Sequence, residues 1–329
     1  MDAPPNPPRF YDARGNVYGV VAPSALAAFG VPATARDAAL CRLAWAPRLI
    51  AELCGWPGPV PPGAKAHRSD GLLIGPFQDS PPFDLLIVNT DGTLAERSGN
   101  GLTIFATALA EQGLFPQASP VTLNVHHDGT TQSPASVVVT HGSAGDGQGF
   151  WVELGRPGFG PEAVAARPDR VIRLAETPLV TVPRLAALDP RWDRTVFVRV
   201  GNPHAVTFLP DESQLPGMAQ LREAGWLKAL TRIAFAEGSE GEGDPCPAGV
   251  NLQWAARRAD GSLAARVFER GEGPTESSGT SATAVASAAL RLGLVAGPRV
   301  EVHMPGGTAP LEAAPDGAMR LFGTARLLP

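Results

Sequence analysis

Two segments of the chain repeat one pattern at a constant offset of 180 residues. Each segment starts with an apolar strand that ends at a polar residue, Asn89 in the first copy and Glu269 in the second. A Ser-Gly pair follows nine residues later, at Ser98 and Ser278, and a glycine ends a small-residue helix fifteen residues after each serine. Self-similarity at a fixed spacing indicates duplicated structural units. We therefore predict two pseudo-symmetric halves that share one cleft.

The length of the chain agrees with this division. Its 329 residues exceed what one compact core usually contains, and 44% hydrophobic residues suffice for two. We predict an α/β (α+β) fold with an N-terminal half over residues 1–153, completed by a C-terminal strand at 321–329. The C-terminal half covers residues 154–320. The first half carries the Ser98 loop and the second carries the Ser278 loop.

Local patterns predict the main elements. Alternating or continuous apolar runs predict strands at 17–21, 72–74, 84–88, 121–125, 150–154, 196–200 and 264–268. Helices are expected at 42–54, where Pro47 limits the start, and at 102–112 and 282–292. Residues 141–149 are expected to form a flexible turn, and His126 and His127 are expected in a surface turn without a metal.

Composition excludes several classes of protein. A net charge of −5 gives no reason to expect a nucleic-acid partner or an anionic membrane surface. No apolar stretch reaches 18 residues and the start has no signal-peptide pattern, so a cytoplasmic protein is expected. The three cysteines form neither a disulfide framework nor a C-x-x-C motif, and no metal site is predicted.

The two serine loops carry the predicted chemistry. Serine is a favoured N-cap residue, and the first turn of a helix exposes unpaired N–H groups and the positive end of its dipole. The glycine after each serine lets an anion approach that backbone. Two such helix starts would hold a carboxylate and present Ser98 and Ser278 to opposite faces of one carbon, as inversion at a Cα requires. The alternative is that both serines only cap helices.

Six stretches of the sequence resemble the diaminopimelate epimerase family, from about Phe10 to the C-terminus. They read ARGNVY, SDGLL, VNTDGTLAERSGNG, VGNPHAV, GVNLQW and FERGEGPTESSGTS. The resemblance implies a curved, mostly antiparallel sheet around a central helix in each half. It also implies inversion at the Cα of a free amino acid by two cysteines, without pyridoxal phosphate or another cofactor. Diaminopimelate would be the substrate and lysine biosynthesis the pathway.

The resemblance also implies roles for individual residues. The positions that would bind the amino acid are Asn16, Asn89, Asn202, Asn251, Glu269 and Arg270. Backbone amides at Gly99, Asn100, Gly279 and Thr280 would hold the reacting carboxylate, and His204 falls at the family's cleft histidine. Arginine pairs bidentately with carboxylates, glutamate accepts from an ammonium group, and asparagine both donates and accepts.

The sequence departs from the family's pattern at the catalytic positions. Ser98 and Ser278 stand where the family has cysteines, and Pro274 replaces a glutamate. A thiol has a pKa of ~8.5, whereas the pKa of a hydroxyl is far higher and closer to that of water. A gap of about 7 units corresponds to roughly 9 kcal/mol against forming the base. A serine base therefore needs a third group to take its proton, and the candidates are Glu96, Glu276 and His204.

Three functions are consistent with these residues. The first is a diaminopimelate epimerase-like isomerase that uses Ser98 and Ser278 in catalysis. The second is a non-catalytic protein that binds an amino acid, and the third is a dehydratase or proton-shift isomerase on the same scaffold. In each, the partner is a small-molecule amino acid, and a homodimer is left open.

Overall fold

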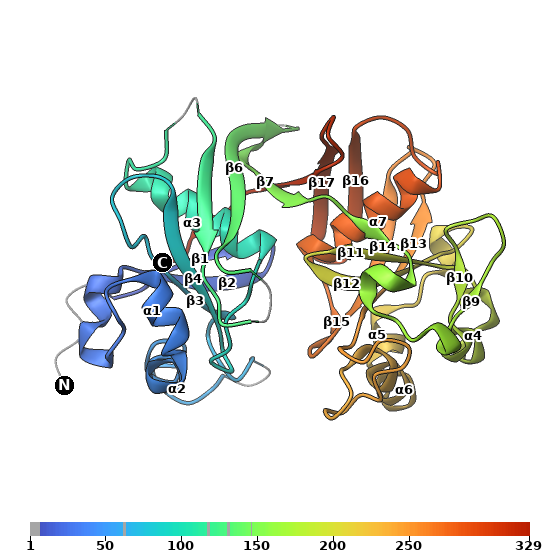
Figure 1. Cartoon of the computed structure of the whole chain (residues 1–329), viewed down its shortest axis with the longest axis horizontal. Helices are drawn as coiled ribbons and strands as arrows, with labels where there is room; N and C mark the ends of the chain where they lie inside the picture. Colours follow the sequence, from blue (N-terminus) through green and yellow to red (C-terminus); the bar gives the residue numbers. More distant parts are fainter. Residues whose placement is uncertain (1–6, 62–63, 117–118, 130–131, 146) are drawn as a thin grey trace. The chain divides into compact units, whose positions relative to one another are not determined.

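The computed structural model describes residues 7–61, 64–116, 119–129, 132–145 and 147–329. The chain forms two compact units (Figure 1). Unit 1 comprises Met1–Glu153 and Phe322–Pro329, and unit 2 comprises Leu154–Leu321. Each unit is described below by itself.

The sheet of unit 1 alternates antiparallel and parallel pairings. β1 and β2 are antiparallel, β2 and β3 parallel, β3 and β4 antiparallel, β4 and β5 parallel, and β5, β6 and β7 antiparallel. The short β19, Arg326–Leu327, pairs with β1. The bounds are β1 Arg9–Ala13, β2 Asn16–Val21, β3 Gly71–Ile74, β4 Phe83–Asn89, β5 Val121–Val125, β6 Ala135–Ala144 and β7 Gly147–Gly155.

Unit 2 repeats this order of pairings. β11 and β12 are antiparallel, β12 and β13 parallel, β13 and β14 antiparallel, β14 and β16 parallel, and β16, β17 and β18 antiparallel. The short β15 pairs antiparallel with β14, β8 and β10 pair with β11, and β9 pairs with β10. The bounds are β8 Gly158–Phe159, β9 Ile172–Arg173, β10 Val180–Thr181, β11 Thr195–Val200, β12 Asn202–Phe208, β13 Asn251–Arg257, β14 Leu263–Glu269, β15 Gly273–Thr275, β16 Arg299–Met304, β17 Gly307–Ala313 and β18 Met319–Gly323.

The helices occupy equivalent places in the two units. α1 (Ala35–Leu40) and α2 (Arg42–Leu53) lie between β2 and β3, as α5 (Met218–Arg222) and α6 (Ala224–Ala234) lie between β12 and β13. α3 (Gly99–Glu111) precedes β5, and α7 (Gly279–Arg291) precedes β16. The remaining α4 covers Pro183–Leu188, and 3-10 turns cover Pro23–Phe29, Pro161–Val164, Pro168–Arg170, Pro190–Trp192 and Glu212–Gln214. The duplicated α/β fold predicted from the repeat is thus confirmed.

The central helices are small-residue helices because sheet surrounds them closely. α3 contacts β1 and β2, and α7 contacts β11, β12, β13, β14, β16 and β17 (Figure 1). Nearly every residue of either helix is buried. Their buried hydroxyls are satisfied in the same way, because Thr103 donates to the carbonyl of Gly99 and Thr283 donates to that of Gly279.

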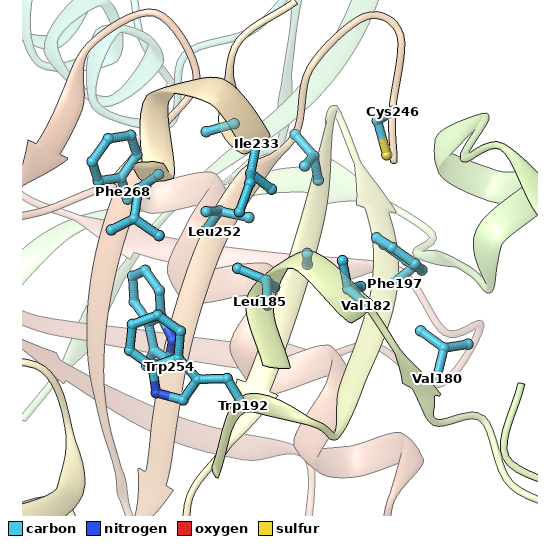
Figure 2. Packing of buried hydrophobic residues seen from close by; sticks show 14 of the residues in the cluster. Val180, Val182, Leu185, Trp192, Phe197, Ile233, Cys246, Leu252, Trp254 and Phe268 are labelled. Atoms are coloured by element: carbon cyan, nitrogen blue, oxygen red, sulfur yellow. The ribbon is translucent and has the colours of Figure 1, made fainter. Parts of the chain in front are cut away.

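The outer helices bury the other face of each sheet. In unit 1, α1 and α2 pack on β3 and β4 around the fully buried Trp45. In unit 2, a larger core joins α4 and α6 to β11, β13 and β14. The rings of Trp192 and Trp254 meet there with centroids 4.7 Å apart (Figure 2). Both sheets are therefore apolar on two faces, which explains the nearly continuous apolar runs in their strands.

Three local predictions were wrong. Residues 141–149 belong largely to the β6–β7 hairpin, with Ala144 paired to Gly147; residue 146 lies outside the described part of the chain. Pro47 was expected to limit the start of its helix, but it lies in the interior of α2, which begins at Arg42. His126 and His127 are buried rather than in a surface turn. Tertiary packing, which short-range turn signals do not report, decides each of these positions.

None of the helices in the described ranges is both long and apolar enough to cross a bilayer.

Gly71 lies where β3 and β4 of unit 1 approach each other closely. Its φ is 154°, and a Cβ there would lie 2.1 Å from the carbonyl oxygen of Val88. Because Gly71 pairs with Asn89 across β3 and β4, a side chain would displace that residue as well. Gly71→Ala should therefore destabilise the protein by at least about 2 kcal/mol in urea unfolding. The control Gly58→Ala, with open space around it, should stay within about 0.5 kcal/mol, and equal losses would contradict the interpretation.

Candidate functional site

Ser98 is the N-cap of α3. Its backbone is extended, with φ −143° and ψ 115°, and its Oγ accepts a hydrogen bond of 3.0 Å from the N–H of Gly101. Gly99 and Asn100 form the buried first turn of the helix. The serine loop of unit 1 is thus a helix start of the type that binds anions, as the sequence predicts.

Two of the predicted binding residues meet at this helix start. Asn100 Nδ2 donates to Asn16 Oδ1 at 2.5 Å, so the β1–β2 turn is joined to α3. Asp70 accepts from the N–H of Val17 at 2.8 Å and holds the start of β2. Asn89 lies at the end of β4 and donates through Nδ2 to Thr93 at 3.0 Å. Asn16 and Asn100 therefore form one polar cluster.

Ser278 is the N-cap of α7 and has a second partner. Its backbone repeats that of Ser98, with φ −154° and ψ 120°, and its Oγ lies 3.4 Å from the N–H of Ser281. The same hydroxyl donates to Glu269 Oε1 at 2.7 Å. The hydroxyl of Thr275 donates to Glu269 Oε2 at 2.8 Å. Both oxygens of one carboxylate are thus engaged by hydroxyl groups, one of them on the predicted catalytic serine.

Tight turn geometry brings Glu269 to Ser278. β14 ends at Glu269, and the chain reverses at once so that Gly273 pairs with Glu269 in β15. The partly buried position raises the pKa of Glu269, because the apolar surroundings disfavour the charge; the hydroxyls of Ser278 and Thr275 oppose the rise. A carboxylate so placed is a stronger base than one in water.

Sequence reasoning named Glu269 but assigned it another role. It predicted Glu269 as an acceptor for a substrate ammonium and sought the proton acceptor for serine among Glu96, Glu276 and His204. None of these three is hydrogen-bonded to the serine of its own unit, within the described residues. Glu276 is exposed and lies 3.5 Å from Arg222. The sequence signal that could have identified Glu269 as the partner of Ser278 is their nine-residue spacing, which places the end of the strand beside the start of the helix.

Arg270 and Asn251 are joined in unit 2. Asn251 is buried at the start of β13, and its Oδ1 accepts from the backbone N–H of Arg270 at 2.8 Å. The guanidinium donates to the carbonyl of Ala248 at 2.8 Å. This orients Arg270 beside Glu269 at the end of β14. Gly279 and Thr280 form the first turn of α7, and Asn202 opens β12 opposite Val200.

His204 is a fully buried, neutral residue. Its Nδ1 lies 3.0 Å from Gln253 Nε2, which also donates to Ser281 Oγ at 3.0 Å. Burial lowers the pKa of the imidazole to about 3, and the charge of Arg270 adds to the shift. His204 therefore connects β12 to the first turn of α7 through Gln253 and is uncharged at neutral pH.

The His204 ring should make the fold sensitive to acid. Its pKa falls from 6.5 unfolded to about 3 folded, so its stabilising contribution is present above pH 6.5 and is lost as the pH falls toward 3. Between pH 7 and pH 5 this corresponds to about 2 kcal/mol in urea unfolding. His204→Asn keeps an acceptor for Gln253 but does not titrate. The variant should lose less stability over this range; an unchanged pH dependence would contradict the assignment.

The contribution of Glu269 to stability should change with pH in the direction opposite to that of His204. Because its pKa is higher folded than unfolded, its contribution is greatest at low pH and is lost as the pH rises through the raised value. Glu269→Gln should therefore raise the melting temperature at pH 7 and leave it nearly unchanged at pH 4. Each 1 kcal/mol corresponds to about 2–4 °C for units of this size. A lower melting temperature at pH 7 would show that the ionised carboxylate is stabilising.

Comparison with solved structures identifies the class of fold. A predicted epimerase from Pseudomonas aeruginosa matches 98% of this chain and 96% of its own, with a TM-score of 0.56 at 16% identity. A hydroxyproline epimerase from Agrobacterium vitis, with bound trans-4-hydroxy-L-proline, matches 98% of this chain and 90% of its own, also with a TM-score of 0.56, at 14% identity. The fold is that of racemases and epimerases.

Sequence comparison identifies the family. The diaminopimelate epimerase family model matches residues 196–328. The diaminopimelate epimerase of Acinetobacter baumannii is 32% identical over 248 residues, 74% of each chain. That of Neisseria meningitidis is 29% identical over 281 residues, 82% of this chain and 87% of its own. The chain belongs to the diaminopimelate epimerase family, and it is an isomerase of the epimerase type.

Proposed function

We propose that this protein transfers a proton at the Cα of a free amino acid, with Ser278 and Glu269 as the acid–base pair. The observation that carries the proposal is the 2.7 Å hydrogen bond between the two side chains at the start of α7. A hydroxyl alone is too weak an acid to yield a base at neutral pH. A neighbouring carboxylate supplies the proton acceptor that it lacks.

The helix starts would bind the substrate carboxylate. The first-turn N–H groups of α3 and α7 lie next to Ser98 and Ser278, at the positive ends of two buried dipoles. Negative charge that develops when the α-proton leaves would spread onto that carboxylate. Preorganised donors in a site of low polarity stabilise such charge strongly. This stabilisation would replace the electron sink of pyridoxal phosphate, so no cofactor is proposed.

The proton would move through the hydroxyl. As Ser278 Oγ takes the α-proton, its own proton passes to Glu269 Oε1, which leaves a neutral carboxyl group and a substrate carbanion. The reverse transfer returns a proton to carbon. The raised pKa of Glu269 suits this role, because a general base is most effective when its pKa approaches the working pH.

The remaining polar residues would orient the amino acid. Arg270 would pair with a carboxylate, and Asn16, Asn89, Asn202 and Asn251 would bind polar groups of the substrate. Diaminopimelate is the first substrate to test, because the relatives are named for it. With that substrate, the protein would serve lysine biosynthesis in the cytoplasm.

Exchange of the α-proton tests the proposal. The protein is incubated in D₂O with LL- or meso-diaminopimelate and with a panel of L-amino acids, and the Cα–H signal is followed by NMR. We expect exchange for one substrate, and a loss of at least about 100-fold in Glu269→Gln. Glu276→Gln, on the same loop but exposed, is the matched control and should exchange at the wild-type rate.

Two results would contradict the proposal. Equal exchange in wild type and Glu269→Gln would exclude the carboxylate as the proton acceptor. Binding measured by calorimetry without exchange of any amino acid would instead support the non-catalytic binding protein. The second candidate has its own support in Ser98, whose Oγ, among the described residues of its own unit, only caps α3.

A further inference from the structure

A pocket lies within unit 2, away from the start of α7. It has a volume of about 550 Å³ and is formed by β8, the β9–β10 hairpin and the C-terminal end of α7, all of which belong to unit 2. β8 pairs with Val198 and Arg199 of β11, and β10 pairs with Thr195, so the two short strands lie along the edge of β11 opposite β12. Phe159 of β8 and Val180 of β10 both line the pocket. Its size is typical of small-molecule sites.

The walls of this pocket are mostly apolar. Their side chains come from the two short strands and from the hairpin turn, and include Phe159, Pro161, Leu174, Pro178, Leu179 and Val180. Glu176 and Thr177, at the tip of the turn, are exposed, so solvent reaches the pocket from this side. Apolar walls with a few placed polar groups are the usual composition of a ligand site. The pocket therefore favours a ligand with an apolar body.

Charged side chains of both signs also line the pocket. They are Arg173, Glu176 and Arg291. Arg173 forms an ion pair with Glu162. Glu176 and Arg291, in contrast, form no ion pair with each other or with any other residue that the structure describes. One pocket thus holds two opposite charges that are not neutralised by a protein partner.

Arg291 can bind a carboxylate while it packs on Phe159. Its Cζ lies over the Phe159 ring, 5.6 Å from the centroid. A contact of this kind uses the face of the guanidinium and leaves the N–H donors at its edge available. Bidentate pairing with a carboxylate uses those edge donors. The aromatic contact therefore positions Arg291 without occupying its hydrogen-bonding groups.

Glu176 is held in a strained turn. Its φ is 61°, in the left-handed region that favours glycine. The turn is fixed by two hydrogen bonds, from the N–H of Leu174 to the carbonyl of Leu179 at 3.1 Å and from the N–H of Thr177 to the carbonyl of Leu174 at 3.3 Å. Strain of this kind is concentrated at functional sites. The turn thus carries a carboxylate at a position where its geometry alone favours glycine.

We propose that this pocket binds a free α-amino acid with an apolar side chain. Arg291 pairs with the ligand's carboxylate, Glu176 accepts from its ammonium group, and the apolar walls contact its side chain. A zwitterion supplies a partner for each of the two unpaired charges at once. Arg291 is the last residue of α7 and Ser278 is its N-cap, so the two sites are about 20 Å apart along the helix. The proposal therefore does not depend on the proposed function.

Binding is measured by fluorine NMR with 4-fluoro-L-phenylalanine, whose signal broadens when it binds the full-length protein. For a ligand of this size we expect a Kd of about 1 mM or below. Two analogues each lack one charge: 3-(4-fluorophenyl)propionate has no ammonium group, and 2-(4-fluorophenyl)ethylamine has no carboxylate. Each should bind at least about 5-fold more weakly, the effect of one charge-assisted contact in a solvent-accessible pocket.

Variants place the ligand in this pocket. Arg291→Gln and Glu176→Gln each remove one charge and should weaken binding of the amino acid by at least about 5-fold. Glu176→Gly removes the carboxylate and also relieves the strained φ, so it should lose binding without a fall in melting temperature. Arg257→Gln, exposed at the end of β13 and outside the pocket, is the matched control and should bind like wild type.

Three results would overturn the proposal. An analogue that binds as tightly as the amino acid would show that the pocket does not recognise a zwitterion. Wild-type binding by Arg291→Gln or Glu176→Gln would place the ligand elsewhere. No broadening at concentrations up to about 10 mM would show that no site for this amino acid exists. Exchange of the α-proton is a separate measurement, so the proposed function can fail while this binding persists, and the reverse.

Discussion

The buried first turn of each central helix is the constraint on which the rest of the structure depends. α7 lies against a sheet that leaves room only for glycine, alanine, serine and threonine at most of its positions, whereas α3 also buries Leu102, Ile104, Phe105 and Leu109. Their hydroxyls are satisfied by carbonyls one turn back, but the N–H groups of the first turn have no such partner within the helix. Ser98 and Ser278 satisfy part of this need, and the remaining donors make each helix start suitable for a carboxylate.

The burial of Glu269 destabilises the charged form of its side chain. The carboxylate is held at the end of β14 by hydroxyls from Thr275 and Ser278, and apolar surroundings raise its pKa. A carboxylate in this position lowers stability near neutral pH, and groups with pKa values perturbed in this way cluster in active sites. His204 is the contrasting case in the same unit. It is buried without charge and contributes to the packing around α7.

The equivalence of the two units extends to the backbone but not to all side chains. The order of strand pairings, the 13-residue central helices and the N-cap dihedral angles agree in the two units. The residue at the strand end differs, because Asn89 and Glu269 share a place in the repeat but not an ability to accept protons. Duplication preserves the backbone geometry of both helix starts, whereas the side chains at the strand end and at positions 95 and 275 differ.

The sequence by itself determined the division into two similar halves, the two helix starts and several of the strands, because these depend on short-range periodicity and on a repeat of fixed spacing. It also placed Ser98, Ser278, Glu269 and Arg270 in the candidate site. Only the tertiary structure decided which groups touch: the turn from β14 into β15 brings Glu269 to Ser278, and His204 on β12 contacts Gln253. The nine-residue spacing of Glu269 and Ser278 is visible in the sequence, but the direction of the turn between them and the burial of the carboxylate depend on packing.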